Sequence, residues 1–345
     1  MTLDEENDLI KKELTCFHTK LPFTDNQLGL GLKVSKIPRT GNIREAETFF
    51  DYISIKAFLK ESINMTSANE RMTHWLPVYF GKGDNIERFW HFLKKSISMI
   101  MTNSTRNFKK EFILEVMPKL IVTIIYHLMD EKKHPSIRSI RLFVQIHSIF
   151  LFCLREFPEL ATDIEKHIRK FVADENCRTK EFQTNLGCIL AYLTGIDTLQ
   201  FSDVAEAYFL EQLDRQILWI LKAVPELIDE LTQKEVDQNK IKIVFKSQMT
   251  SFQMFCFYKL FISEVCEKRK SRKNLLDEYE GNLCKLSNKE EEEFQKKIFD
   301  LQKRVKTFPD FFEYVGLKKR DEKQLVFMLK AAIANSERKK YHGEF

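Results

Sequence analysis

The sequence predicts an all-α protein whose helices form an irregular antiparallel array, either a HEAT- or armadillo-like solenoid or a bundle. Glycine and proline are scarce, with 10 and 8 residues in a chain of 345, so a sandwich of short strands would lack its turns. From residue 44 onward, apolar residues recur at intervals of three and four, which is the period of a helix with one buried face. No fixed repeat length emerges, and the array is therefore expected to be irregular.

The expected helices follow one another with short connections. They cover residues 45–62, 85–102, 108–130, 136–157, 159–173, 179–194, 202–222, 224–235, 240–268, 272–285, 288–307 and 321–339. Capping boxes mark the start of the last two, because Ser287 is followed three residues later by Glu290, and Asp321 by Gln324. Pro118 lies inside an apolar run, so its helix is expected to kink or to begin there.

Three segments of different character divide the chain. Residues 1–44 are expected to hold a short helix and an irregular segment, because turn-forming residues gather there: Pro22, Gly29, Gly31, Pro38 and Gly41. Leucines alternate with other residues from Leu28 to Val34, which allows one short strand or extended clamp. Residues 45–268 are expected to form the main helical array. Residues 269–345 are expected to form a charged helical hairpin, since charge density rises sharply near that boundary.

Charge and cysteine content limit the kinds of partner and the cellular compartment that we expect for this protein. The 55 basic and 50 acidic residues give a net charge of +5, which is a weaker field than a dedicated nucleic-acid binder carries. Seven cysteines, an odd number without a Cys-x-x-Cys pair, are typical of buried free thiols in a reducing compartment. Since the first residues do not resemble a leader peptide and the apolar runs contain charges, we expect an intracellular protein, cytoplasmic or nuclear, with no membrane span.

Motifs of known catalytic sites are absent from the sequence. It contains no phosphate-binding G-x-x-x-x-G-K-[ST] loop, and Gly29-Leu30-Gly31 lacks the third glycine of a dinucleotide-binding turn. No two of the eight histidines lie three or four residues apart, so local spacing predicts no metal site. We therefore expect a protein that is not an enzyme and that carries no cofactor or metal.

Two arginines in a turn are the first candidate for partner binding. Arg39 and Arg44 lie in and after Pro38-Arg39-Thr40-Gly41, directly before a predicted helix. Guanidinium groups in such a turn can hold a carboxylate or phosphate through paired hydrogen bonds. The alternative is that both arginines pair with acids of this chain and fix the turn.

An aromatic turn at residues 73–80 is the second candidate. It contains His74, Trp75 and Tyr79, and tryptophan and tyrosine are favoured anchors of protein interfaces because each combines a large ring with a polar tip. The alternative is that these rings fill the core from a loop.

A cluster of cations is the third candidate. This basic run consists of Lys268, Arg269, Lys270, Arg272 and Lys273. Such a cluster can meet an acidic partner or a nuclear import receptor. The alternative is a solvated helix end, where cations are favoured by the helix dipole.

Four short stretches form an ordered pattern: Leu28-Gly29, Pro38-Arg39-Thr40-Gly41, Thr73-His74-Trp75-Leu76-Pro77 and Pro118-Lys119-Leu120. In this order they resemble a helical region that accompanies ubiquitin-conjugating-type domains in some large eukaryotic proteins, over about residues 20–225. Conjugating activity is not carried over, because His134-Pro135-Ser136 lacks the asparagine that follows His-Pro in those enzymes. The resemblance implies a non-catalytic scaffold near the ubiquitin machinery.

The sequence therefore predicts a non-enzymatic helical scaffold that binds protein partners. One alternative is an accessory component of ubiquitin conjugation, in which Arg39, Arg44, His74 and Trp75 contact a partner. Another is a nucleic-acid-associated helical protein, whose affinity would fall steeply with salt. An enzyme with an active site assembled from distant residues is a further alternative, and a deep pocket with converging polar groups would favour it.

Overall fold

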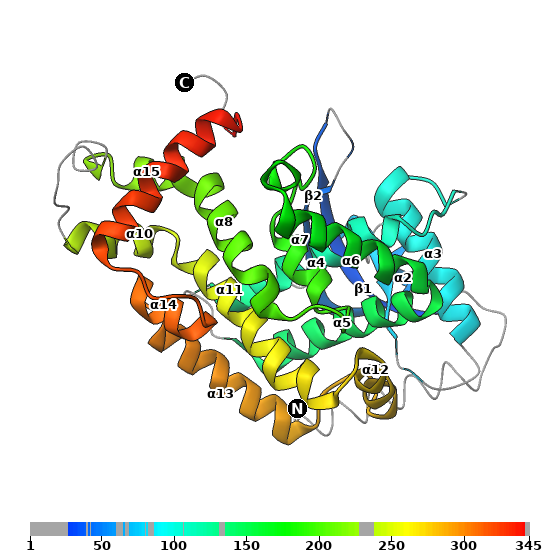
Figure 1. Ribbon diagram of the computed structural model, residues 1–345. Helices are drawn as coiled ribbons and strands as arrows, with labels where there is room; N and C mark the ends of the chain where they lie inside the picture. Colours follow the sequence, from blue (N-terminus) through cyan, green and yellow to red (C-terminus); the bar gives the residue numbers. More distant parts are fainter. Residues whose placement is uncertain are drawn as a thin grey trace.

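The computed structural model shows a mostly helical protein with a small antiparallel sheet (Figure 1). It describes residues 27–38, 41, 43–59, 65, 69–79, 81, 86–105, 107–130, 135–227 and 238–341. The predicted helical character is confirmed, whereas the sheet is an addition to the predicted all-α class. Most of the helix expected at residues 224–235 lies outside the described residues.

Three strands form the sheet, in the order β2-β1-β3. The central strand β1 (Leu28–Lys36) pairs antiparallel with β2 (Ile43–Ser54) and with β3 (His74–Pro77). The short strand expected from Leu28 to Val34 is confirmed. The helix predicted at residues 45–62 is wrong, because β2 fills most of that range and only the single turn α2 (Ile55–Phe58) follows it.

Both composition and a partner strand favour an extended conformation for β2. Ile43, Thr48, Phe49 and Ile53 are β-branched or aromatic, and such residues fit a pleated surface better than a helix. Gly41 adopts φ 67° in the connection between β1 and β2, a conformation that glycine reaches at little cost. Pairing with β1 therefore overrides the helical spacing that the sequence shows after residue 44.

The two glycines of β1 allow a close approach of side chains to the strand. A Cβ atom at Gly29 would lie 2.2 Å from Cε2 of Trp75, and one at Gly31 would lie 1.8 Å from Sδ of Met72. Glycine inside a strand often marks such a contact. Gly29-Leu30-Gly31 is thus explained by packing within the sheet.

Helices of the first half of the chain cover the sheet and continue away from it. They are α3 (Ile86–Thr102), α4 (Phe112–Met129), α5 (Ile137–Glu156), α6 (Pro158–Ala173), α7 (Gly187–Leu193) and α8 (Phe201–Ala223). α3 contacts β3, and α4 and α5 contact β2. The helix predicted at residues 179–194 is wrong in its first half, where turns and bends precede α7.

The second half of the chain is mostly helical in its described part. Its helices are α10 (Gln238–Ser247), α11 (Met249–Phe261), α12 (Arg272–Gly281), α13 (Asn288–Arg304), α14 (Phe308–Val315) and α15 (Glu322–Arg338). A π-helical turn and a 3-10 turn continue α11 to Arg269. Both predicted capping boxes are confirmed, at Ser287 and at Asp321. The sequence did not predict α14, which Thr307 caps.

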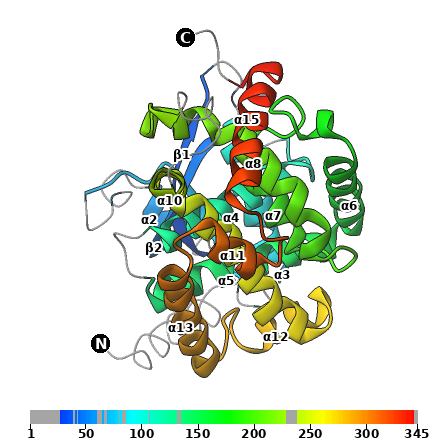
Figure 2. The same ribbon diagram turned by 60° about the vertical axis from the view of Figure 1, so that its left-hand side comes forward.

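One continuous apolar core joins the sheet to the last helix. It runs from Leu30 in β1 to Ala332 in α15, and Phe252, Phe209 and Phe311 meet within it. Figure 1 shows the sheet and α3 on one side of the molecule and α13, α14 and α15 on the other, and Figure 2 shows α15 against α8. The predicted division at residues 44 and 268 stays a prediction, although its first boundary falls inside β2.

Two central helices, α4 and α5, are long and apolar enough to cross a membrane when judged by length and composition alone. Their apolar windows are 61% and 83% buried inside the structure. Core helices of globular folds have the same length and composition, so this property is a weak indication of a membrane span.

Candidate functional site

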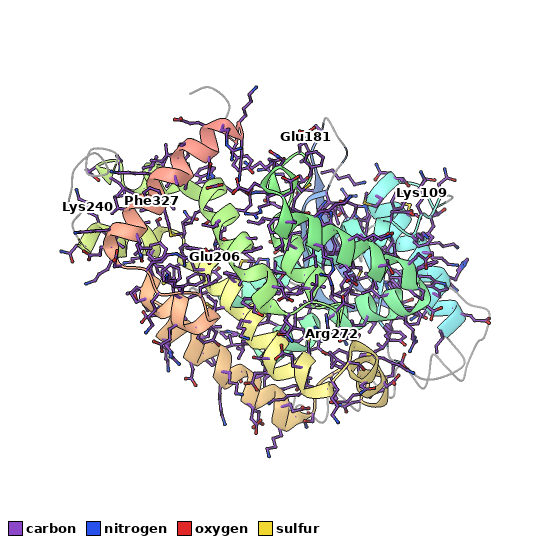
Figure 3. All side chains as sticks on the ribbon, in the orientation of Figure 1. Lys109, Glu181, Glu206, Lys240, Arg272 and Phe327 are labelled. Atoms are coloured by element: carbon purple, nitrogen blue, oxygen red, sulfur yellow. The ribbon has the colours of Figure 1, made fainter. Side chains whose placement is uncertain are left out.

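A cavity of about 310 Å³ lies between α4, α6, α7 and the turns of residues 179–186. We call it the polar cavity, and its lining is Glu111, Leu114, Glu115, Lys119, Asp163, Ile164, His167, Phe182, Gln183, Thr184, Asn185, Cys188 and Tyr192. Glu181, labelled in Figure 3, marks the turn segment above α7. Small-molecule sites begin at about this size, roughly 300 Å³.

The α4 wall of the polar cavity carries three charged residues at four-residue spacing. Glu111, Glu115 and Lys119 therefore follow one another along the same side of the helix. The Lys119 side chain is buried, and its ammonium lies 2.9 Å from the Glu115 carboxylate, which compensates its charge. Next to this wall, Lys110 is paired with Glu159 at 2.6 Å.

A proline in α4 fixes the position of an aromatic ring in the cavity. Pro118 lies inside α4, which begins at Phe112, so the alternative of a helix beginning at the proline is wrong. Because proline has no N–H, the carbonyl of Leu114 loses its helical donor. The Tyr192 hydroxyl donates to that carbonyl at 3.0 Å. Burial raises the pKa of Tyr192 well above its ordinary value, so this hydroxyl stays protonated.

The α6 wall and the turns supply the remaining polar groups. Asp163 and His167 are four residues apart on α6 and share one side of it. Nε2 of His167 lies 2.6 Å from Oε1 of Gln183, and the Gln183 amide donates to the carbonyl oxygen of Asn185. Phe182 lies at the rim with 60% of its surface exposed.

Arg215 of α8 holds the turns from inside the protein. Its guanidinium donates to the carbonyl oxygens of Arg178 and Gln183 at 2.6 Å each and to that of Thr184 at 3.2 Å. Its Nε donates to Glu211 at 2.7 Å. The planar group with five donors suits this position, since a lysine ammonium could not reach the same carbonyls.

The same buried network extends to the residues that follow α15. Lys339 lies 2.6 Å from Glu211 and 2.7 Å from Asp214, and the Tyr341 hydroxyl donates to Glu211. Burial raises the pKa of Asp214 above its ordinary value, whereas Lys339 opposes that shift. We call Glu211, Asp214, Arg215, Lys339 and Tyr341 the Glu211 network. It connects the end of α15 to one wall of the polar cavity.

The polar cavity presents acceptors and aromatic rings but no activated nucleophile. Burial raises the pKa of Cys188 to about 12, so its sulfur is a thiol at neutral pH. Across the described residues, no three His, Cys, Asp or Glu side chains lie close enough together to hold a metal ion. The arrangement is suited to binding a ligand.

The aromatic residues predicted to bind a partner lie mainly in the core. Trp75 is 4% exposed, and its indole N–H donates to the carbonyl of Ile53 at 2.9 Å. Tyr79 is 2% exposed; its hydroxyl donates to Glu280 and accepts from Arg155 at 3.3 Å. Their burial matches the alternative of rings that fill the core, and it leaves little surface for a partner.

The other residues of these two turns are placed separately. His74 is half-buried, with Nδ1 2.9 Å from Oγ1 of Thr73, and burial lowers its pKa with a contribution from Lys36. Arg44 is exposed at the start of β2. Arg39 lies outside the described residues. The predicted grouping of Arg39, Arg44, His74, Trp75 and Tyr79 is thus untested as a site, and none of them lines the polar cavity.

The basic run divides into internal and exposed cations. Arg269 pairs with Glu278 at 2.6 Å and also with Glu290. Arg272 donates to the carbonyl of Thr194 at 2.7 Å, at the end of α7, where a cation also complements the helix dipole. Of the remaining three, Lys268 pairs with Glu264 at 2.7 Å, and Lys270 and Lys273 are exposed.

The polar cavity was not predicted from the sequence, because the apolar spacing predicted a helix over residues 179–186. Asn185 inside that range and Gly187 directly after it are turn-forming residues, and they were the available signal. Comparison with protein-family models and with curated proteins finds no match to this chain. The resemblance to a region beside ubiquitin-conjugating-type domains therefore stays a prediction.

Proposed function

We propose that this chain is a non-enzymatic helical scaffold that binds a protein partner through the surface around Phe327. The observation that supports this is the exposure of Phe327, 72% in α15, between the buried Leu325 and Leu329. Figure 3 labels Phe327 on α15. A large apolar ring in water is unfavourable, and exposed apolar surface with polar neighbours is typical of interaction sites.

A shallow groove of about 490 Å³ surrounds this ring. We call it the Phe327 groove, and its lining is Lys318, Arg320, Asp321, Lys323, Gln324, Phe327 and Met328. Arg320 is held in place, with its guanidinium 5.0 Å from the ring centre of Phe312 and paired with Glu206. Lys318 and Lys323 are exposed, so their charges face solvent beside the ring.

The chemistry of the Phe327 groove favours an acidic amphipathic segment as the partner. Its apolar side chain would cover Phe327, and its carboxylates would approach Lys318 and Lys323. Aromatic residues near the centre of an interface contribute most of the binding energy, while charges at the rim select the partner. In this proposal the helices form an irregular solenoid-like or bundle-like array that displays the groove.

A library of random peptides displayed on phage tests this function. Selection against the immobilised chain is expected to enrich peptides that combine Asp or Glu with Leu, Phe or Trp. Phe327→Ser and the double variant Lys318→Glu with Lys323→Glu should each weaken the selected peptides by at least roughly tenfold. Trp219→Ser is the matched control, because Trp219 is also an exposed aromatic residue, at 60%, on α8.

Two outcomes of this selection would contradict the proposal. The first is no enrichment over several rounds, and the second is a set of peptides that bind Phe327→Ser as tightly as the unmodified chain. Selected peptides without acidic residues would contradict the proposed partner chemistry.

Two of the alternative functions, nucleic-acid binding and a role in ubiquitin conjugation, receive less support from the geometry. A nucleic-acid surface built on the basic run would lose Arg269 and Arg272, whose side chains are 9% and 11% exposed and bound within the chain. In an accessory role in ubiquitin conjugation, Trp75 would offer a partner little surface, because its ring is buried. Both remain predictions from the sequence.

A further inference from the structure

The polar cavity has an excess of negative charge. Three carboxylates line it, those of Glu111, Glu115 and Asp163, against the single ammonium of Lys119. Glu115 is occupied by Lys119. Within the described part of the chain, no cationic side chain forms an ion pair with Glu111 or Asp163. The nearby Lys110 is paired with Glu159 and acts on these two carboxylates only through longer-range electrostatic attraction. Both side chains line the cavity and are exposed to solvent, so two carboxylates are accessible to a ligand there.

Aromatic rings complement these carboxylates. Phe182 lines the cavity with much of its ring uncovered, and Tyr192 lines it with its hydroxyl tied to α4. The His167 ring meets the Tyr192 ring edge to face, with centres 5.9 Å apart. Cations bind favourably over aromatic faces, most strongly where the cation is partly removed from water.

From this combination we infer that the polar cavity binds an organic cation, an alkylammonium or guanidinium group on an extended aliphatic stem. The stem would lie against Leu114, and the charged end would reach Glu111 and Asp163. The volume of about 310 Å³ fits one such chain and is too small for a folded peptide segment. A free diamine and the side chain of a lysine in a partner protein share this chemistry.

Calorimetric titration with 1,5-diaminopentane tests the site, and the uncharged 1,5-pentanediol is the control ligand. The diamine is expected to bind and the diol to bind at least roughly tenfold more weakly, because only the diamine pairs with carboxylates. The double variant Glu111→Gln with Asp163→Asn should weaken the diamine at least roughly tenfold. Glu293→Gln on α13, another exposed carboxylate, should leave binding unchanged.

Thermal unfolding of each variant tests whether the fold is retained. Phe182→Leu keeps an apolar side chain but removes the ring, and a several-fold loss of diamine affinity is expected from it. The proposal is overturned if the diamine does not bind, if the diol binds equally well, or if the double variant binds the diamine like the unmodified chain.

A second titration distinguishes the two sources of the cation. A short blocked peptide with one lysine is compared with the same peptide acetylated on that lysine. If the lysine peptide binds and its acetylated form does not, the site is assigned to a protein side chain. If the diamine binds and neither peptide does, the site is assigned to a small amine. Phe327→Ser should leave diamine binding intact, so failure at the Phe327 groove and failure at the polar cavity are separate results.

Discussion

Gly29 shows how strongly one missing side chain shapes the sheet. A Cβ at this position would meet Trp75 at 2.2 Å and the carbonyl oxygen of Leu76 at 2.4 Å, and neither can move without disturbing β3. Gly29→Ala is expected to lower the free energy of unfolding by about 2 kcal/mol or more, measured by urea denaturation. Gly281→Ala is the control, because no atom lies within 4 Å of its added Cβ. It should change stability by about 1 kcal/mol or less, in the favourable direction.

His147 makes the protein sensitive to mild acid. The ring is buried against Phe143 and Phe261, its Nε2 lies 3.2 Å from the carbonyl of Thr194, and Tyr279 and Arg272 face it. Burial lowers its pKa from 6.5 to about 3. Below about pH 6.5 the unfolded chain therefore binds a proton at this residue, whereas the folded chain does not. The free energy of unfolding consequently falls as pH falls toward about 3.

The loss attributable to His147 is expected to reach about 2 kcal/mol at about pH 5. Urea denaturation at neutral and acidic pH measures it. His147→Gln retains an N–H donor for Thr194 but does not titrate, so its unfolding free energy should depend less on pH over this range. An equal pH dependence in both proteins would contradict the assignment.

At the scale of elements, signals within a segment predicted the helices, whereas β2 and the turns of residues 179–186 depend on contacts with residues distant in the sequence. α13 and α15 were predicted closely because their capping boxes and apolar spacing lie within each helix. β2 was not predicted, since it depends on pairing with β1. The turns of residues 179–186 were not predicted for a similar reason. Carbonyl groups in them accept hydrogen bonds from Arg215, which lies about thirty residues further along the chain.

Arg215→Lys tests how the turns are held. Lysine keeps a charge near Glu211, but its donors lie on a single nitrogen and cannot bond Glu211 and all three carbonyl oxygens together. A loss of about 1–3 kcal/mol in stability is expected, with faster amide hydrogen exchange at Gln183 and Asn185 and weaker diamine binding. Arg169→Lys is the control, because Arg169 is exposed and pairs only with Glu165 among the described residues. Unchanged exchange in Arg215→Lys would show that the turns are held by other contacts.

At the scale of the whole molecule, the sequence indicated the amount of helix but not the position of the candidate site. The polar cavity combines α4, α6, α7 and the turns, and each contributes only a few ordinary polar residues. The sites predicted from the sequence were instead local clusters of arginine, lysine and aromatic residues. In the structure, Trp75 and Tyr79 lie in the core, and Arg269 and Arg272 are bound to neighbouring groups of the chain. A local cluster of such residues is a poor guide to a binding site in a protein whose single core contains side chains from the whole chain.

The Glu211 network has a consequence for regulation. α15 displays Phe327 on its outer side, and the residues directly after it join Glu211, whose neighbour Arg215 fixes a wall of the polar cavity. A partner that shifts α15 would therefore change the cavity, and by thermodynamic linkage a cation in the cavity would change partner affinity by the same factor. Diamine affinity measured with and without a saturating groove peptide is expected to differ several-fold. Equal affinities would show that the two surfaces act independently within one folded unit.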